Sequence, residues 1–197
     1  MPDVRVLGLV ASPSEQSRTR VLVQRILDAA REQGASCEVI TLAGLSIDAA
    51  DGRQAEEYSG DTERLLTSID AADAIVFGMP VYRAEMPGSL KNLLDIIPRG
   101  RYDGVAQALR AKPIGLAATG ASDHHFLALN GLGEMMRGFF AAYVVPPGVY
   151  ASHADFAEGQ LGSERVVRCA DATGRALVEL GRAIARSPEL MQVEPLV

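Results

Sequence analysis

A hydroxyl-rich segment at residues 11–19 carries the first pattern that could do chemistry. It joins an apolar run to a helical pattern, so its backbone N–H groups lie where a helix begins, and such unpaired donors attract anions. Its polar side chains include Ser12, Ser14, Ser17, Arg18 and Thr19. Hydroxyls and a forked guanidinium suit a phosphate group. The same residues would also serve as a helix cap and turn, so this segment alone leaves both interpretations open.

Two familiar nucleotide-binding signatures are absent from the sequence. No Gly-Lys-Ser or Gly-Lys-Thr triplet is present, and the first apolar run does not end in G-x-G-x-x-G. The first motif cradles the phosphates of nucleoside triphosphates and the second binds dinucleotides. Nucleoside triphosphate hydrolysis is therefore disfavoured, and any phosphate site here is of another kind.

A second segment, at residues 80–88, is stiffened by prolines at both ends. Its first four residues are Pro80, Val81, Tyr82 and Arg83. A proline-fixed backbone presents its N–H and C=O groups in fixed positions, which suits the edge of a flat ligand. An ordinary proline-rich turn with a packing tyrosine is the alternative interpretation.

A third segment of small residues follows another apolar run and precedes a helical pattern. It consists of Thr119, Gly120, Ala121 and Ser122. Small side chains allow a planar ligand to lie close to the backbone, although a plain turn capped by Ser122 would look the same. Taken together, the three segments describe a site for a flat molecule with a phosphate at one end.

The elements that must position these segments alternate along the chain. Apolar runs predict strands at residues 4–10, 37–42, 74–79 and 113–118, and a fifth strand region at 143–150 is broken by Pro146-Pro147-Gly148. Helical spacing predicts helices at residues 17–33, 62–71, 89–97, 123–140 and 163–186. This alternation predicts a flavodoxin-like, doubly wound parallel sheet of five strands in the order 2-1-3-4-5, with helices on both faces. In such sheets ligands bind beyond the carboxyl ends of the strands, where all three segments lie.

The chain length predicts one domain over residues 1–187 and a tail over residues 188–197. The tail is expected to be loosely held or docked on another subunit. Residues 43–60 are expected to form a loop, and residues 99–111 a connection that is partly helical.

Composition excludes several classes of protein. Hydrophobic residues make up 48% of the chain and charged residues 22%, as in folded domains. Nineteen basic against 25 acidic residues give a net charge of −6 with no basic run, which argues against a nucleic-acid partner. No apolar stretch approaches the ~20 residues of a membrane span. We therefore expect no nucleic-acid or membrane partner.

Metal binding and secretion are likewise not expected. Cys37 and Cys169 are far apart, and the pair His124-His125 has no third ligand at a supporting spacing. Residues 1–5 have no basic start and no small-residue cleavage site, so we expect a reducing, cytoplasmic setting. No convincing Ser-His-Asp or Cys-His constellation is visible.

The chain resembles the NADPH-dependent FMN reductases of the flavodoxin-like superfamily, especially the flavin reductases of two-component sulfonate monooxygenase systems. The resemblance covers about residues 4–155. It rests on Ser12-Pro13-Ser14 with Ser17-Arg18-Thr19, on Pro80-Val81-Tyr82-Arg83-Ala84 with Pro87-Gly88-Ser89-Leu90-Lys91, on Ala118-Thr119-Gly120-Ala121-Ser122 with His125, and on Gly148-Val149-Tyr150-Ala151.

The resemblance implies a role for each of the three segments. The first would hold the FMN phosphate through Ser12, Ser14, Ser17, Arg18 and Thr19. The second would hold the ribityl chain and one side of the ring through Pro80, Val81, Tyr82 and Arg83. The third would meet the pyrimidine edge through Thr119, Gly120, Ala121 and Ser122, with backbone donors at Gly120, Ala121 and Ser122.

The implied activity is hydride transfer from NADPH or NADH to flavin N5, so that no catalytic side chain is needed. A partner monooxygenase would consume the reduced FMN. The alternatives are an NAD(P)H-dependent quinone or azo reductase with tightly bound FMN, and a flavodoxin-like electron carrier.

The resemblance also implies a homodimer or homotetramer, in which Leu90, Leu93 and Leu94 would help to build the interface. Burial of the same leucines in the core of one chain is an equally good interpretation. One departure is Asn130-Gly131, where the sulfonate-linked enzymes often carry Asp-Tyr.

Overall fold

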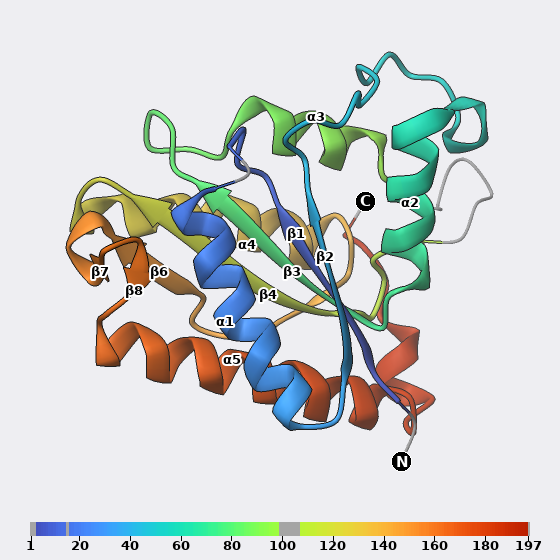
Figure 1. Cartoon of the computed structure of the whole chain (residues 1–197). Coiled ribbons are helices and arrows are strands. Elements are labelled where there is room, and N and C mark those ends of the chain that lie inside the picture. The colour runs from blue at the N-terminus through green and yellow to red at the C-terminus, as the bar shows by residue number, and fades with distance from the viewer. Residues whose placement is uncertain (1–2, 15, 99–106, 197) are drawn as a thin grey trace.

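The central sheet of the computed structural model is parallel and runs β2-β1-β3-β4-β5, with β6 also paired to β4 (Figure 1). The structure describes residues 3–14, 16–98 and 107–196. The strands of this sheet are β1 (Arg5–Val10), β2 (Ser36–Thr41), β3 (Ala74–Pro80), β4 (Pro113–Gly120), β5 (Tyr143–Val144) and β6 (Val149–Ser152). This order confirms the predicted flavodoxin-like topology. The fifth strand region is split into β5 and β6 at the expected break.

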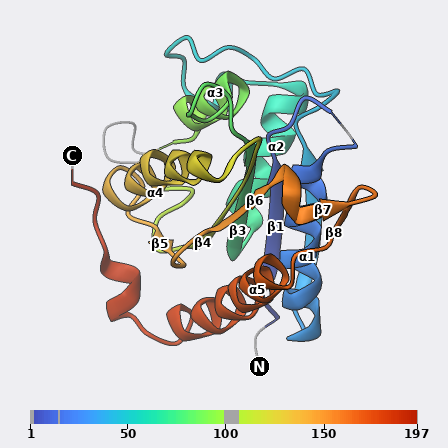
Figure 2. The ribbon, with the colours of Figure 1, turned by 90° about the vertical axis from the view of Figure 1, so that its left-hand side faces the viewer.

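Helices cover both faces of the sheet (Figure 2). They are α1 (Arg18–Glu32), α2 (Gly60–Ala71), α3 (Gly88–Ile96), α4 (Ala128–Gly138) and α5 (Glu164–Ile184). One apolar core joins α1 and α5 to the sheet, and the other joins α2, α3 and α4 to the opposite face. The middle strands β3 and β4 are buried on both faces, which explains their nearly continuous apolar sequence.

Glycines let α1 approach the sheet and α5 closely. A Cβ atom at Gly78 on β3 would lie 2.2 Å from Val23 Cγ2 of α1. A Cβ atom at Gly174 on α5 would lie 2.2 Å from the carbonyl oxygen of Ile26. Because both contacts are shorter than any side chain could tolerate, glycine is required at both positions. This packing fixes the first turn of α1 at the carboxyl end of β1.

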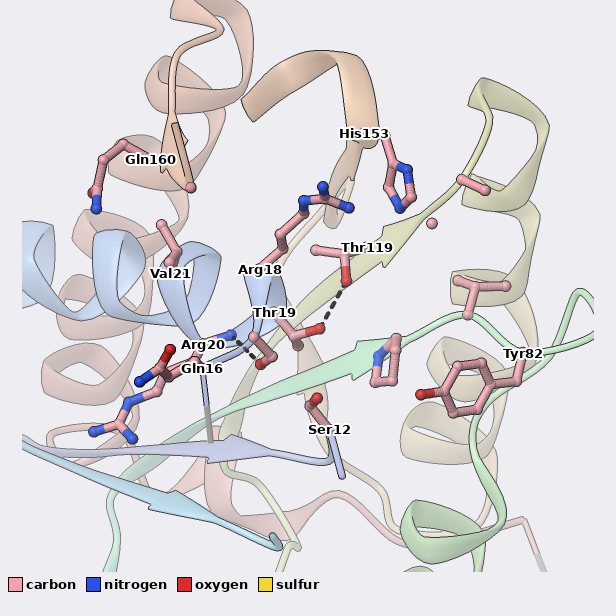
Figure 3. A pocket seen from close by; sticks show the side chains of 16 residues that line it. Ser12, Gln16, Arg18, Thr19, Arg20, Val21, Tyr82, Thr119, His153 and Gln160 are labelled. Carbon is pink, nitrogen blue, oxygen red and sulfur yellow. Dashed lines mark hydrogen bonds between the residues drawn. The ribbon is translucent and has the colours of Figure 1, made fainter. Parts of the chain in front are cut away.

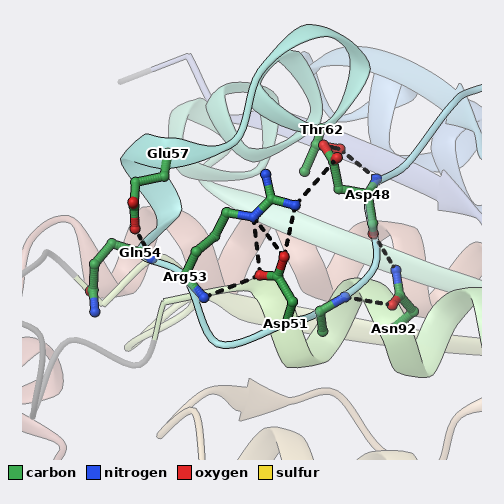
Figure 4. Close-up of polar contacts among 8 residues, drawn as sticks. Asp48, Asp51, Arg53, Gln54, Glu57, Thr62 and Asn92 are labelled. Carbon is green, nitrogen blue, oxygen red and sulfur yellow. Dashed lines mark hydrogen bonds and ion pairs between the residues drawn. The ribbon is translucent and has the colours of Figure 1, made fainter.

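The long segment between β2 and α2 was predicted to be a loop, and polar contacts hold it in place (Figure 4). The backbone N–H of Asp48 donates to Thr62 Oγ1 at 2.9 Å, and this hydroxyl donates to the Asp48 carboxylate, also at 2.9 Å. Asn92 Nδ2 on α3 donates to the carbonyl oxygen of Asp48 at 2.7 Å. Arg53 forms ion pairs with Asp51 and Asp48. The segment is therefore anchored to both α2 and α3.

Two local predictions were wrong. The helix expected over 123–140 is a 3-10 helix at Asp123–Leu127 followed by α4. Phe126 and Leu127 are exposed, so this stretch has no buried face to support an α-helix. The turn expected at 119–122 begins later, because Thr119 and Gly120 still pair with β6 in the sheet.

A small hairpin was absent from the sequence prediction. It consists of β7 (Phe156–Ala157) and β8 (Gln160–Leu161), joined by Glu158 and Gly159 at φ +50° and +80°. These left-handed conformations are those of the two-residue turns that match strand twist. Further 3-10 helices lie at Ala55–Glu57, His153–Asp155 and Glu189–Gln192.

The structure decides between the two interpretations of the α3 leucines. Leu90, Leu93 and Leu94 are at most 3% exposed and belong to the core of this one chain. Residues 188–196 of the tail also contact this chain, since Tyr143 Oη donates to the carbonyl oxygen of Leu190 at 3.0 Å. Within the expected connection at 99–111, residues 99–106 lie outside the described residues.

Candidate functional site

A cavity of about 900 Å³ opens where β1, β3 and β4 end (Figure 3). It brings together residues from all three predicted segments: Ser12, Ser17, Arg18, Thr19, Pro80, Val81, Tyr82, Thr119, Gly120 and Ala121. Three predicted site residues are not part of its lining, namely Ser14, Arg83 and Ser122. A volume of this size is at the upper end of the range for cofactor pockets, roughly 300–1,000 Å³.

The first turn of α1 forms one end of the cavity. Ser17 caps the helix, because its hydroxyl accepts the backbone N–H of Arg20 at 3.1 Å. Ser12 is 5% exposed, and its hydroxyl accepts the backbone N–H of Ser14 at 3.2 Å. The cap and turn interpretation of these serines therefore holds, and it coexists with their place at the cavity. Ser14 contributes by shaping the loop from outside the lining.

Two arginines give this end of the cavity a positive charge. Neither Arg18 nor Arg20 has an ion-pair partner among the described residues. The guanidinium of Arg18 lies over the ring of Phe156 in β7, 5.8 Å from its centroid, which is within cation–π range. Together with the backbone donors at the start of α1, these side chains form a site for an anionic group.

A pair of threonines forms the floor between the two ends. Thr19 and Thr119 are both buried, and their hydroxyl oxygens are 2.7 Å apart and hydrogen-bonded. Thr19 thus reaches the end of β4 instead of pointing freely into solvent. The resemblance implied that Thr19 holds a phosphate, and its hydroxyl is already engaged with Thr119.

The proline-stiffened segment forms the opposite end of the cavity. Val81 N donates to the carbonyl oxygen of Thr119 at 2.8 Å, which ties the segment to β4. Tyr82 and Glu85 exchange two backbone hydrogen bonds of 3.0 Å across a tight turn. Arg83 occupies that turn at φ +53° and lies outside the lining. Tyr82 is 49% exposed and lies at the end of the cavity farthest from Gln160 (Figure 3).

Gly120 has a packing role that differs from the one expected. A Cβ atom there would lie 2.4 Å from Tyr150 Oη and 3.0 Å from His125 Cβ. Its small size is therefore required by these two side chains, in addition to any ligand. The Tyr150 hydroxyl donates to the carbonyl oxygen of Ser122, and neither residue is part of the cavity lining.

Four polar residues of the cavity were missed by sequence reasoning. His153 follows β6 and Gln160 belongs to β8, while Gln16 precedes α1 and Arg20 lies in its first turn. His153 could have been found, because it follows the fifth strand region at the same edge of the sheet as the other segments. Gln160 gave no such signal, since its two-residue strand has no hydrophobic periodicity.

The site contains no obvious protein nucleophile. Burial raises the pKa of both thiols, at Cys37 and Cys169, and neither lines the cavity. In the part of the chain that the structure describes, no group of three His, Cys, Asp or Glu residues could hold a metal ion. The Nδ1 atom of His125 is buried behind Gly120 without a hydrogen-bond partner.

The residues present fit a flavin mononucleotide. One end offers the guanidinium groups of Arg18 and Arg20 and helix N–H donors for a dianionic phosphate, and the other offers an exposed tyrosine and small residues for a flat ring system. Ser12, which is buried, belongs to the same lining. A flavodoxin-like sheet with this cavity at its carboxyl edge defines the chain as a flavodoxin-like flavoprotein.

Comparison with known proteins gives the family. The model of the NADPH-dependent FMN reductase family matches residues 4–157, which include all three segments. The chain belongs to this family. It is an oxidoreductase, an NAD(P)H-dependent FMN reductase.

Two relatives illustrate the similarity. The NADH-dependent FMN reductase SfnF of Pseudomonas fluorescens is 34% identical, over 82% of this chain and 83% of that protein. The NAD(P)H-dependent FAD/FMN reductase of Geobacillus thermodenitrificans is 32% identical, over 71% of this chain and 72% of that protein.

A solved structure shows the same fold. The apo form of the NADH:FMN oxidoreductase EmoB has a TM-score of 0.77, covering 96% of this chain and 95% of that one, at 19% identity. In the described ranges, no helix is both long and apolar enough to cross a membrane.

Proposed function

We propose that the cavity holds FMN as an exchangeable substrate, and that reduced FMN leaves to supply a partner monooxygenase. The observation that carries this proposal is the single cavity that unites the three segments and opens at Tyr82, which is half exposed. A ligand held at such a mouth can exchange with solvent. The similarity to SfnF also supports FMN as a substrate, because that protein is itself an FMN reductase.

The residues would divide the work of binding between the two ends. Arg18, the Ser12 hydroxyl and the N–H groups at the start of α1 hold the phosphate. Tyr82 and Val81 flank the ribityl chain and one side of the ring. Backbone donors at Gly120 and Ala121 face the pyrimidine edge, where preorganised N–H groups stabilise negative charge. Ser14, Arg83 and Ser122 would act from outside the lining, by holding the loops in shape.

When bound, FMN supplies the hydride-accepting ring of the reaction, and NADPH or NADH supplies the hydride. The protein's task is to orient the ring and leave one face open to the nicotinamide. The exposed mouth beside Tyr82 provides that access. His153 lines the cavity and can hydrogen-bond the ligand near the phosphate end (Figure 3).

We further propose that the protein self-associates and that it works in the cytoplasm. Phe126 and Leu127 end the 3-10 helix that follows the third segment, and they are 50% and 57% exposed. Adjacent exposed apolar side chains mark an interaction surface. We assign this surface to contact between two copies of the chain, in a dimer or a tetramer.

Anaerobic oxidation of NADPH and NADH by the purified protein tests the proposal, with free FMN varied from none upward. We expect a rate near zero without FMN and saturation as FMN is added. A protein that retains FMN through gel filtration and turns over only with a quinone or an azo dye would instead hold its flavin as a prosthetic group. Absence of oxidation with any acceptor would point to an electron carrier.

A further inference from the structure

The segment that joins β6 to α5 forms a wall of the cavity. His153, Gly159 and Gln160, all from this segment, belong to the lining. In Figure 3, the Arg18 side chain extends from α1 between His153 and Gln160. The ring of Phe156, in β7 of the same segment, faces the Arg18 guanidinium, and its centroid is 5.8 Å from the guanidinium carbon. This wall therefore meets the side chain that we assign to the phosphate of FMN.

The Phe156 ring is itself held in place. It is half-buried and packs against the apolar core that joins α1 and α5 to the sheet. Asp155, the residue before it, is anchored twice. Its carboxylate accepts the backbone N–H and the hydroxyl of Ser152 at 2.8 and 3.0 Å, and its carbonyl oxygen accepts the N–H of Gly162 at 2.8 Å. The ring is therefore a fixed surface, whereas Arg18 is an exposed side chain on a helix.

The contact with the ring leaves the hydrogen-bond donors of Arg18 available. A cation–π contact is made with the ring face and engages no oxygen acceptor, so the N–H groups of the guanidinium can still bind phosphate oxygens. Arg25, further along α1, is held in a different way, because it donates two hydrogen bonds of 2.6 Å to the Asp171 carboxylate. That carboxylate occupies donors of Arg25, and its negative charge would repel a phosphate.

Arg18 has neither an ion-pair partner nor a side-chain hydrogen-bond partner among the residues that the structure describes. The ring of Phe156 is the contact that restricts its guanidinium. An unrestricted arginine loses rotamer freedom when it binds a ligand, and this ordering lowers affinity. An arginine that already lies against a fixed ring loses less freedom, and it keeps its donors for the ligand.

We propose that Phe156 is a positioning residue for FMN, whose ring holds the Arg18 guanidinium at the phosphate end of the cavity before the ligand binds. The ring acts through Arg18, and Arg18 acts on the phosphate. Phe156 therefore favours FMN over riboflavin, which has the same ring system and ribityl chain but no phosphate. The inference rests on the proposed function, in which Arg18 holds the phosphate of FMN.

Flavin fluorescence titration of the full-length protein with FMN and with riboflavin tests this role. Phe156→Leu keeps an apolar side chain in the hairpin but removes the ring face. We expect the Kd for FMN to rise about fivefold in this variant and the Kd for riboflavin to stay within about twofold. Phe156→Tyr retains a ring face, so both Kd values should stay within about twofold of those of the parent protein.

A double-mutant cycle separates this role from general support of the hairpin. In the Arg18→Ala background, Phe156→Leu should change the Kd for FMN by less than about twofold, because the ring then has no guanidinium to hold. Tyr58→Leu is the matched control. It removes another ring that faces an arginine, since the guanidinium carbon of Arg53 is 4.6 Å from the Tyr58 centroid, and neither residue lines the cavity. This control should leave the affinities for FMN and riboflavin unchanged.

Equal losses of affinity for FMN and riboflavin in Phe156→Leu would overturn the inference, because they would show a purely structural role. A loss of FMN affinity that persists in the Arg18→Ala background would overturn it too, as would a loss in Phe156→Tyr equal to that in Phe156→Leu. If Arg18→Ala weakens FMN binding but Phe156→Leu does not, only the role of Phe156 is refuted. An Arg18→Ala variant with the parent's FMN affinity would instead refute the phosphate placement in the proposed function itself.

Discussion

The hydroxyl oxygens of Thr19 and Thr119 lie 2.7 Å apart, although the two residues are separated by a hundred positions in the chain. One belongs to the first turn of α1 and the other to the end of β4. This hydrogen bond fixes the anion-binding end of the cavity relative to the ring end, so the distance between the two halves of the site depends on it.

Replacement of Thr119 by valine should therefore destabilise the protein. Valine has the same side-chain shape as threonine, but it leaves the buried Thr19 hydroxyl without its partner. This should lower the free energy of unfolding by about 1–3 kcal/mol. Urea unfolding measures the loss. The double variant Thr19→Val/Thr119→Val removes both hydroxyls and should cost less than the sum of the single changes. Strict additivity in this cycle would show that the two hydroxyls do not interact.

Arg18 should contribute more to FMN affinity than any exposed arginine elsewhere. Arg18→Ala removes a guanidinium that has no ion-pair partner among the described residues and lines the cavity. We expect FMN binding to weaken by about 1.5–3 kcal/mol, the value of a hydrogen bond to a charged group. Calorimetric titration gives the number, with Arg175→Ala as the control. An FMN affinity equal to that of the control would remove Arg18 from the phosphate site.

Much of this site was predictable because buried parallel strands have a distinctive sequence. The runs at residues 74–79 and 113–118 are almost wholly apolar, so both strands and the segments that follow them could be placed on one edge of a sheet. The two-sided burial of β3 and β4 is the physical reason.

Other parts could not be predicted, because local sequence does not encode them. The β7–β8 hairpin has strands of two residues, too short to show periodicity, and its turn places Glu158 in a left-handed conformation that the residue type does not indicate. The engagement of Thr19 by Thr119 depends on tertiary packing alone. Gly120 was predicted to be small for a ligand, but Tyr150 and His125 already require it.

Gly120→Ala should lower stability through a clash that can be relieved. The new Cβ would meet Tyr150 Oη at 2.4 Å, and overpacking of this kind costs about 1–3 kcal/mol. Adding Tyr150→Phe removes that oxygen, so the double variant should recover part of the loss in thermal unfolding. Equal stabilities of the single and double variants would mean that the His125 contact, at 3.0 Å, decides the cost instead.

Leu127→Ser should shift the protein toward smaller assemblies. Leu127 is 57% exposed, and with its exposed neighbour Phe126 it forms the apolar surface that we assign to self-association. Multi-angle light scattering measures the mass of each species, and its dependence on concentration gives the association constant. Ala183→Ser, an exposed position on α5, is the matched control. A parent protein that is monomeric at all concentrations would contradict the proposed oligomer.

Lys112 should make stability depend on pH in the alkaline range. Burial lowers the pKa of its ammonium group from 10.5 to about 8, although its Nζ donates to the carbonyl oxygens of Ile69 and Asp70 at 2.9 and 2.7 Å. Between these two pKa values the unfolded chain binds more protons than the folded one, so the free energy of unfolding rises with pH.

The expected gain between pH 8 and pH 10.5 is on the order of 2 kcal/mol. Urea unfolding across this range measures the gain. In Lys112→Met, the part of the rise in unfolding free energy that is due to this lysine should be absent. Lys91 is the control, because it is exposed and paired with Asp95, so Lys91→Met should keep the parent's pH dependence. A parent protein and a Lys112→Met variant with parallel pH profiles would show that the Lys112 amine keeps its ordinary pKa in the folded state.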